Sequence, residues 1–410
     1  RKRATWSSPG ASTTANLAAG LFSPRDLALE LGTEGYSPSL IRKIEYAGGN
    51  SSSFKQASEA LKRLAKLPID PKHVSRITER LGQERLVERE DDVKKFKAGT
   101  LKPRYQDVPS VAVVEVDAGK CQLRDEGSPR GVHNPHWGDT KVASFVTYPK
   151  PALQQDYQPD PPRAFLDRTT VRRLCSEMER IRSEATLGSH EKTPKPCNRT
   201  AAAPAKRKSP RPIMRTAVAT TANVEAFGDL VATEAHHRNF HDAKTSAVIG
   251  DGGNWIGPFA EMHFPDSFQI LDFLHLLVHL YAAAKSACPN MPSRSWPLYT
   301  ALLTKAWQGK TKDVLAGMER HLDRIGAPAK DTPNDNPRSI LARAIKYVRD
   351  NENRMKYPDY RRHGLPITSS LVESLIKQFN LRIKGSEKFW CRERVEGVLH
   401  IHDLWTLQLF

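Results

Sequence analysis

Apolar and polar positions follow a helical spacing over residues 23–90. Each predicted helix begins at a capping Ser or Asp, often with Pro next, and the first two end near Gly. In SPSLIRKIEYAGG, Ser37 is the predicted cap and Gly48-Gly49 the predicted stop. Two later stripes, one per helix, are Phe54, Ala57, Leu61, Leu64 and Val74, Ile77, Leu81. The pattern predicts a helical domain, which is either a DNA-reading module or a plain helical bundle with solvated basic faces.

The pattern changes to strands after this domain. The run PSVAVVEV (109–116) is rich in β-branched residues without helix caps, and it predicts a strand that ends at Asp117. Two further strands are predicted at 121–124 and 141–148, separated by a Gly/Pro-rich loop. A short strand is predicted at 245–251, and one long helix at 265–287 that starts near Pro265 and Asp266. Residues 296–350 and most of 371–409 are predicted to be helical.

Charge and composition narrow the function. The 410-residue chain has 63 Lys+Arg against 46 Asp+Glu, a net charge of +17. This excess indicates a polyanionic partner, nucleic acid first and an anionic membrane second. No clean apolar run of about 18 residues occurs, which argues against an integral membrane protein. The five cysteines lack CxxC spacing, which favours a reducing cytosol over a disulfide framework or zinc ribbon. The first residue is Arg, so we interpret the chain as a fragment or a truncated reading frame.

Three acidic residues are the candidate catalytic groups. Asp117 and Asp251 follow predicted strands, and Glu373 falls in the first turn of a helix that opens after GLPITSS. Asp251 precedes two glycines, a pattern typical of a turn. It is also typical of a carboxylate at a strand end, where glycine lets a backbone or a phosphate approach. Three such carboxylates can hold two Mg²⁺ ions for phosphodiester chemistry.

Two further groups of residues carry weaker candidates, each with an alternative. Asp272 and His275 share a helix face, with His279 beyond them, and we favour a capping or supporting role over metal binding. His136 and Trp137, with His133, either contact DNA ends or order their loop. A third set interleaves cations with aromatic rings, and it either grips phosphates and stacks a base or packs as core beside solvated charges. Its members are Lys384, Lys388, Phe389, Trp390 and Arg392.

Five segments resemble one family when taken in order. They are VAVVEVDAGKCQLR, GVHNPHWGDTKVASF, AVIGDGGNWI, FPDSFQILDFLHLLVHL and GLPITSSLVESLIKQFNLRIKGSEKFW. Together they are similar to DDE transposases of bacterial insertion sequences of the ISKra type. The resemblance implies an α/β fold with a ribonuclease-H-like mixed sheet flanked by helices. It also implies that Asp117, Asp251 and Glu373 form the catalytic triad and coordinate Mg²⁺ or Mn²⁺. The Asp272 and His275 positions of its DFxH signature would help frame the pocket.

The resemblance implies a reaction and a domain plan. Water would cut double-stranded DNA at the transposon ends, and the freed 3′-OH would attack target DNA, with a homodimer on the DNA in the bacterial nucleoid and no membrane partner. The predicted plan is an N-terminal remnant (1–22), a helical DNA-binding domain (23–105), the core (106–150, 214–285 and 354–410), a Pro-rich and basic linker (151–213) and a helical insertion (286–353). The basic stretch 190–213 is a phosphate-contacting arm or a solvated loop. Two alternatives remain open, a DNA-binding relic without catalysis and another ribonuclease-H-like nuclease.

Overall fold

The computed structural model describes residues 35–124, 136–149, 155–184, 212, 214–385 and 388–406. The chain divides into two compact units, residues 1–81 and 82–410. Predictions for residues 1–34, for the loop 125–135 with His133, and for nearly all of the basic stretch 190–213 lie outside the described residues. The predicted domain plan stays a prediction.

The first unit is helical where it is described. It contains α2 (Pro38–Asn50), α3 (Phe54–Ala65) and the first part of α4 (Pro71–Lys97). Ile44, Ala57 and Ile77 are fully buried in its core, so most of the predicted apolar stripes are confirmed. One detail of the prediction is wrong, since Leu64 is 87% exposed. α2 ends at Asn50, one residue beyond the predicted stop, and the bare backbone of Gly48 packs directly against Thr78.

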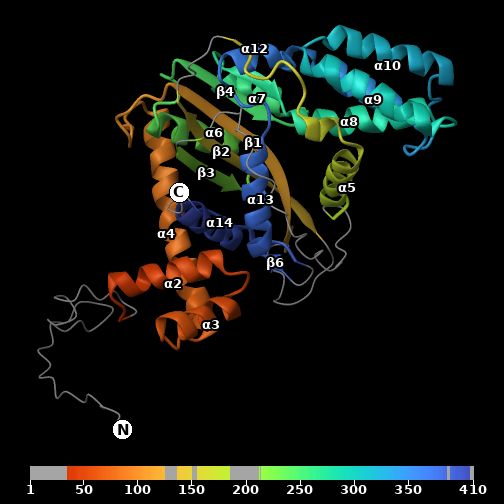
Figure 1. Ribbon diagram of the computed structural model, residues 1–410. Coiled ribbons are helices and arrows are strands. Elements are labelled where there is room, and N and C mark those ends of the chain that lie inside the picture. Colours follow the sequence, from red (N-terminus) through yellow and green to blue (C-terminus); the bar gives the residue numbers. More distant parts are fainter. Residues whose placement is uncertain are drawn as a thin grey trace, which may run out of the picture. The chain divides into compact units, whose positions relative to one another are not determined.

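The second unit is built on one mixed sheet. Its strands are β1 (Val111–Leu123), β2 (Trp137–Tyr148), β3 (Met214–Thr220), β4 (Thr245–Gly250), β5 (Phe268–Leu271) and β6 (Phe389–Trp390). The order is β3-β2-β1-β4-β5, with β6 paired to the far end of β1. β1 pairs antiparallel with β2 and parallel with β4, so the sheet changes direction at β1 (Figure 1). The predicted mixed sheet flanked by helices is therefore confirmed.

The helices of this unit complete the chain order. They are η1 (Arg163–Leu166), α5 (Arg168–Glu184), α6 (Val224–His237), α7 (Ile256–His263), α8 (Phe273–Ala287), α9 (Pro292–Trp307), α10 (Thr311–Ile325), α11 (Pro337–Asp350), η2 (Glu352–Arg354), α12 (Tyr357–Arg362), α13 (Ser370–Ile383) and α14 (Arg392–Thr406). Helices α9 to α11 fall within the predicted insertion, 286–353. Among the described helices, none is both long enough and apolar enough to cross a bilayer.

β1 is longer than the sequence indicates. The prediction that a strand ends at Asp117 and another begins at 121 is wrong, because β1 runs unbroken through Asp117 to Leu123. The polar stretch stays extended since its backbone pairs with β2 along the whole hairpin, from Val111 opposite Tyr148 to Gln122 opposite Trp137. Pairing with β4 does stop at Val116. Asp117 is thus the first residue of β1 beyond its parallel neighbour.

The predicted single helix over 265–287 is also wrong at its start. Residues 268–271 form β5, which pairs in parallel with β4, and the helix begins only after Asp272. The Asp272 carboxylate accepts the backbone N–H groups of Leu274 (2.6 Å) and His275 (2.9 Å). This is the side-chain cap that a helix needs at its first turn. The sequence prediction placed the start at Pro265 because Pro-Asp is itself a helix-start signal.

Both faces of the sheet are covered, and the alternation along each strand assigns residues to a face. Val113 of β1 and Ile249 of β4 belong to the larger core, which includes residues of α5 and of α8 to α12. Val114 and Val248 belong to the smaller core, with residues of α6 and α7. Two-residue periodicity places Asp117 on the face of Val113, and Asp251 on the face of Ile249. Figure 1 shows α13 lying across β1.

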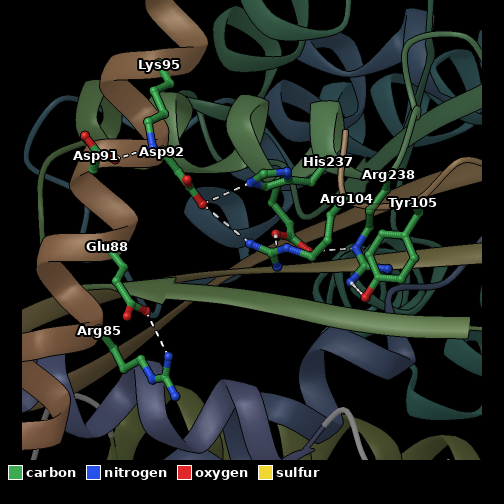
Figure 2. A network of polar contacts seen from close by, with 10 residues as sticks. Arg85, Glu88, Asp91, Asp92, Lys95, Arg104, Tyr105, His237 and Arg238 are labelled. Carbon is green, nitrogen blue, oxygen red and sulfur yellow. Dashed lines mark hydrogen bonds and ion pairs between the residues drawn. The ribbon is translucent and has the colours of Figure 1, made fainter. Parts of the chain in front are cut away.

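Ion pairs bind the second part of α4 to α6. Asp92 lies 3.1 Å from His237 and 3.5 Å from Arg104 (Figure 2). Lys97 pairs with Asp229. The guanidinium of Arg238 lies 4.5 Å from the centre of the Tyr105 ring. Charged side chains on this stretch of α4 therefore form ion pairs within the protein.

Candidate active site

Three neighbouring strands each place an aspartate at the same level of the sheet. Val116 is opposite Gly250, and Gly250 is opposite Leu271. The residues that follow are Asp117, Asp251 and Asp272. The backbone N–H of Asp272 donates to the Gly250 carbonyl (2.8 Å), which fixes the ends of β4 and β5 against each other. The parallel register therefore sets three aspartates side by side at one edge of the sheet, as is common at the carboxyl ends of parallel strands.

Asp251 shapes its own loop. Its Oδ1 accepts the backbone N–H of Gly253 (2.9 Å), so the turn interpretation of this aspartate is correct. The glycines serve packing inside the protein. A Cβ on Gly252 would lie 2.1 Å from a ring carbon of Tyr347, and one on Gly250 would lie 3.0 Å from the Val116 carbonyl oxygen. The interpretation that glycine clears room for a phosphate does not hold at Gly252, where a tyrosine fills the space.

Glu373 reaches the site from the first turn of α13, as predicted. Two buried carboxylates hold the start of this helix. The Oε2 of Glu115 accepts the backbone N–H groups of Leu371 (3.1 Å) and Val372 (2.9 Å). Asp272 accepts the backbone N–H and the hydroxyl of Ser369. Acceptors at a helix N-terminus satisfy its free N–H groups and its partial positive charge. Glu373 is thus fixed by β1 and by the β5–α8 junction.

Asp272 is a structural cap. It is fully buried, and both of its oxygens are occupied by donors from α8 and from Ser369. These bonds and the charge of His275 outweigh burial and lower the pKa of Asp272. Ligand atoms of Asp272, His275 and Glu373 lie within 4.8 Å of one another, a spacing that can hold a metal ion. Because Asp272 already receives four hydrogen bonds, we assign it to support rather than coordination, in line with the favoured interpretation of the sequence.

The carboxylates lie close enough to perturb one another. Burial raises the pKa of Asp117 to about 7, and the negative charges of Asp251 and Glu373 act in the same direction. Burial also raises the pKa of Glu373, with Asp272 as a second cause. Crowded carboxylates resist ionisation unless a cation joins them. The sheet and α13 therefore bring Asp117, Asp251 and Glu373 into one electrostatic cluster.

His275 supplies a positive charge to this cluster. Its Nδ1 lies 3.4 Å from the Asp272 carboxylate. Burial disfavours the charged ring, but Asp272, Asp117 and Asp251 outweigh burial and raise the pKa of His275 to about 9. A protonated imidazole has no free lone pair for a metal. His275 in this state balances the carboxylates, while His279 stacks on the Tyr347 ring with centroids 3.8 Å apart.

The donor set suits a hard divalent cation. Oε1 of Glu373 is buried and has no hydrogen-bond partner among the described residues. A buried carboxylate oxygen without a donor is costly, about 1–3 kcal/mol or more for a charged group. Oxygen ligands favour Mg²⁺ or Mn²⁺ over softer metals. Among the described residues, Glu373 shares with Asp272 and His275 the spacing that can hold an ion, and Asp117 and Asp251 lie near enough to influence this group electrostatically.

The basic and aromatic candidates gather elsewhere, at the far end of β1. Trp137 is opposite Gln122, Trp390 pairs beside Leu123, and the Lys384 ammonium lies 5.8 Å from the centre of the Trp137 ring. His136 adjoins them through its carbonyl, which accepts the Leu123 N–H (2.8 Å). The step from Asp117 to Leu123 spans about 20 Å of extended strand.

Three members of this second group serve the fold. Lys388 donates to the carbonyls of Leu381 (3.0 Å) and Arg382 (3.1 Å) at the end of α13. The Trp390 indole donates to the Ile383 carbonyl (2.8 Å), and Arg392 donates to the Thr221 carbonyl (2.8 Å). His136 is exposed, and Trp137 and Lys384 are half-buried. The contacts of Lys388, Trp390 and Arg392 favour the alternative in which they support the core.

Glu115 is a site residue that sequence reasoning missed. It is 1% exposed and holds the start of α13. Burial raises its pKa to about 8, against the effect of the Val372 and Leu371 N–H groups. The signal was present in VAVVEV, where one charged residue interrupts a buried apolar strand. Charged residues are almost never fully buried without a partner, so Glu115 requires one.

Comparison of the chain with protein-family models and with curated proteins finds no match.

Proposed function

We propose that this chain catalyses metal-dependent cleavage of DNA phosphodiester bonds. The observation that carries the proposal is the electrostatic coupling of Asp117 to Asp251 and Glu373, together with a buried Glu373 oxygen that has no partner among the described residues. The net charge of +17 supports a polyanionic substrate. Divalent cations bound by such carboxylates would supply charge stabilisation for phosphodiester cleavage.

Within this class we propose a DDE transposase with a ribonuclease-H-like core. Support comes from the mixed sheet, from carboxylates at the change of strand direction, and from the motif order that resembles insertion-sequence transposases. Water cuts the transposon end, and the freed 3′-OH then attacks the target strand. Asp117, Asp251 and Glu373 would hold the cations, and His275 keeps a proton beside them. Glu115 and Asp272 position Glu373. Double-stranded DNA is the proposed partner, bound by a homodimer.

The test combines plasmid nicking with cation binding. Wild-type protein is expected to nick supercoiled DNA with Mg²⁺ or Mn²⁺ and to bind Mn²⁺ in calorimetry. Glu373→Gln and Asp117→Asn are expected to lose both by about a hundredfold or more, since even residues that merely orient ligands are worth about 10–100-fold. Each variant should also raise the metal-free Tm, because it removes one crowded charge.

The control is Glu261→Gln on α7, an exposed carboxylate outside the cluster, which should keep full nicking. Wild-type protein that binds DNA without nicking it, with any cation, would replace the proposal with a DNA-binding relic. Nicking without joining a pre-cut 3′-OH end to the plasmid would indicate another nuclease. An unchanged Mn²⁺ affinity in both variants would rule out the assigned ligands.

A further inference from the structure

A basic groove lies outside the carboxylate cluster, where α5, the end of α8 and the start of α9 meet. Its free volume is about 380 Å³. The residues that carry the argument are Arg168, Arg172, Tyr281, Lys285 and Trp296. The three cationic side chains are exposed, and the two rings are half-buried. The groove therefore presents positive charge over an aromatic floor.

The positive charge of this groove is not neutralised from within. Among the described residues, no carboxylate lines the groove, and no ion pair involves Arg168, Arg172 or Lys285. Aromatic rings hold two of the cations instead. The Arg168 guanidinium lies 5.5 Å from the centre of the Trp296 ring, and the Lys285 ammonium lies 5.8 Å from that of Tyr281. Such contacts restrict a cation by about 0.5–1 kcal/mol at exposed sites and leave its charge available.

Two helices connect the groove with the carboxylate cluster. On α5, the charge of Glu177 contributes to the raised pKa of Glu373, and Arg172 lies about 7 Å earlier along the same helix. On α8, Lys285 lies about 15 Å beyond His275. DNA rises about 3.4 Å per base pair, so about 15 Å corresponds to four or five nucleotides. A strand whose phosphodiester lies at Asp117 and Glu373 can extend to the groove.

We propose that this groove binds backbone phosphates of the DNA strand that enters the carboxylate cluster, with Arg168, Arg172 and Lys285 as the phosphate contacts. This inference rests on the proposed function. A polyanion fits better than a single phosphate group, because exposed ion pairs contribute only about 0–1 kcal/mol each. Several contacts to one polymer act together by releasing its condensed counterions. Trp296 and Tyr281 position the cations.

The experiment measures the salt dependence of DNA binding. The probe is a fluorescein-labelled duplex with a single-stranded overhang, because phosphate contacts do not require a particular sequence. The triple variant Arg168→Gln/Arg172→Gln/Lys285→Gln is expected to reduce the slope of log Kobs against log salt by about 2–3, close to one per lost contact. The charge-preserving variant Arg168→Lys/Arg172→Lys/Lys285→Arg is expected to keep the slope.

The matched control removes the same charges from α10, in Arg320→Gln/Arg324→Gln/Lys312→Gln, where all three side chains are also exposed. This control is expected to keep most of the slope. A groove variant that binds with the wild-type slope while the wild type still nicks DNA would overturn the groove assignment and leave the proposed function standing. A wild type that binds with the expected slope but never nicks would overturn the function alone. ATP binding that needs the three cations, with unchanged DNA binding, would overturn the groove assignment in favour of a free nucleotide.

Discussion

Polar side chains occur at both ends of β1, but their interactions differ. Near Asp117, burial and neighbouring carboxylates raise the pKa values of Asp117 and Glu373, and Glu373 keeps an oxygen without a donor among the described residues. Near Leu123, the ammonium of Lys388 and the indole of Trp390 donate to main-chain carbonyls of α13. We call the Asp117 end the strained end, because its carboxylates repel one another, and the Leu123 end the satisfied end, because its polar groups are hydrogen-bonded within the protein.

This difference separates a candidate site from a structural cluster. Buried polar groups normally find partners within the protein. A buried polar group without a hydrogen-bond or charge partner therefore indicates a site where a ligand can bind. A group whose hydrogen bonds are made within the protein indicates a structural role. Sequence pattern alone gave both ends a functional interpretation, because both combine charges with aromatic or glycine-rich surroundings.

The largest effect on the fold of the strained end is expected from Glu115. Replacing it with Ala leaves the N–H groups of Leu371 and Val372 without their acceptor. We expect a loss of about 3 kcal/mol in the free energy of unfolding, since each buried unpaired group costs about 1–3 kcal/mol. Urea denaturation measures it. Mn²⁺ affinity should fall as well, because the start of α13 positions Glu373.

The conservative variant Glu115→Gln tests whether the role of this side chain is to accept the hydrogen bonds of the α13 start. Because burial raises the pKa of Glu115 to about 8, its carboxyl is largely protonated at neutral pH, and a Gln carbonyl can accept the same two N–H groups. Stability and Mn²⁺ affinity should return close to wild type. If Gln is as damaging as Ala, the helix-start bonds are not the role of this residue.

His275 should make the metal-free protein sensitive to alkaline pH. Its folded-state pKa is about 9, above the ordinary value of 6.5. The folded state keeps a proton that the unfolded chain releases, so this stabilisation is complete below pH 6.5 and is lost as pH rises through 9. The loss is at most about 3 kcal/mol. Urea denaturation in EDTA at both ends of this range measures it, and His275→Gln should reduce the slope while His363→Gln keeps it; the remaining slope is expected from Glu115 and Asp117, whose pKa values are also raised.

The smallest effect is expected at the satisfied end. Trp390→Phe removes the indole donor to the Ile383 carbonyl and should lower the free energy of unfolding by about 1 kcal/mol. DNA affinity and nicking should stay at the wild-type level, because the ring's polar group is used within the fold. A variant of unchanged stability but weakened DNA binding would reverse the comparison between the two ends of β1.

Much of the framework could be read from the sequence. The strand near Val113, the short strand before Asp251 and the helix start before Glu373 each had local signals, namely β-branched runs and capping residues. The candidate carboxylates could be named because each follows or opens such an element. The helical face of Ala57 and Leu61 was also correct.

The errors arose where distant pairing overrides local signals. Residues 117–120 stay extended because β2 pairs with them, and Phe268–Leu271 form a strand because β4 lies beside them. Neither partner is visible from local composition. The roles of Glu115 and of Tyr347 beside Gly252 likewise depend on contacts between residues far apart in the chain. The roles of Lys388 and Trp390 follow from their hydrogen bonds to main-chain carbonyls of α13, which residue type alone does not reveal.

The bonds between Asp272 and Ser369 also close a long excursion of the chain. These residues are 97 positions apart, and the Phe273 N–H also donates to the Ile367 carbonyl beside them (2.9 Å). These bonds join the two ends of the segment that contains α8 to α12. Loop-closure entropy grows slowly, by about 0.6 kcal/mol per doubling of length. The entropy of closing this excursion therefore depends only weakly on its length, and the bonds at its two ends keep Glu373 in register with the strands.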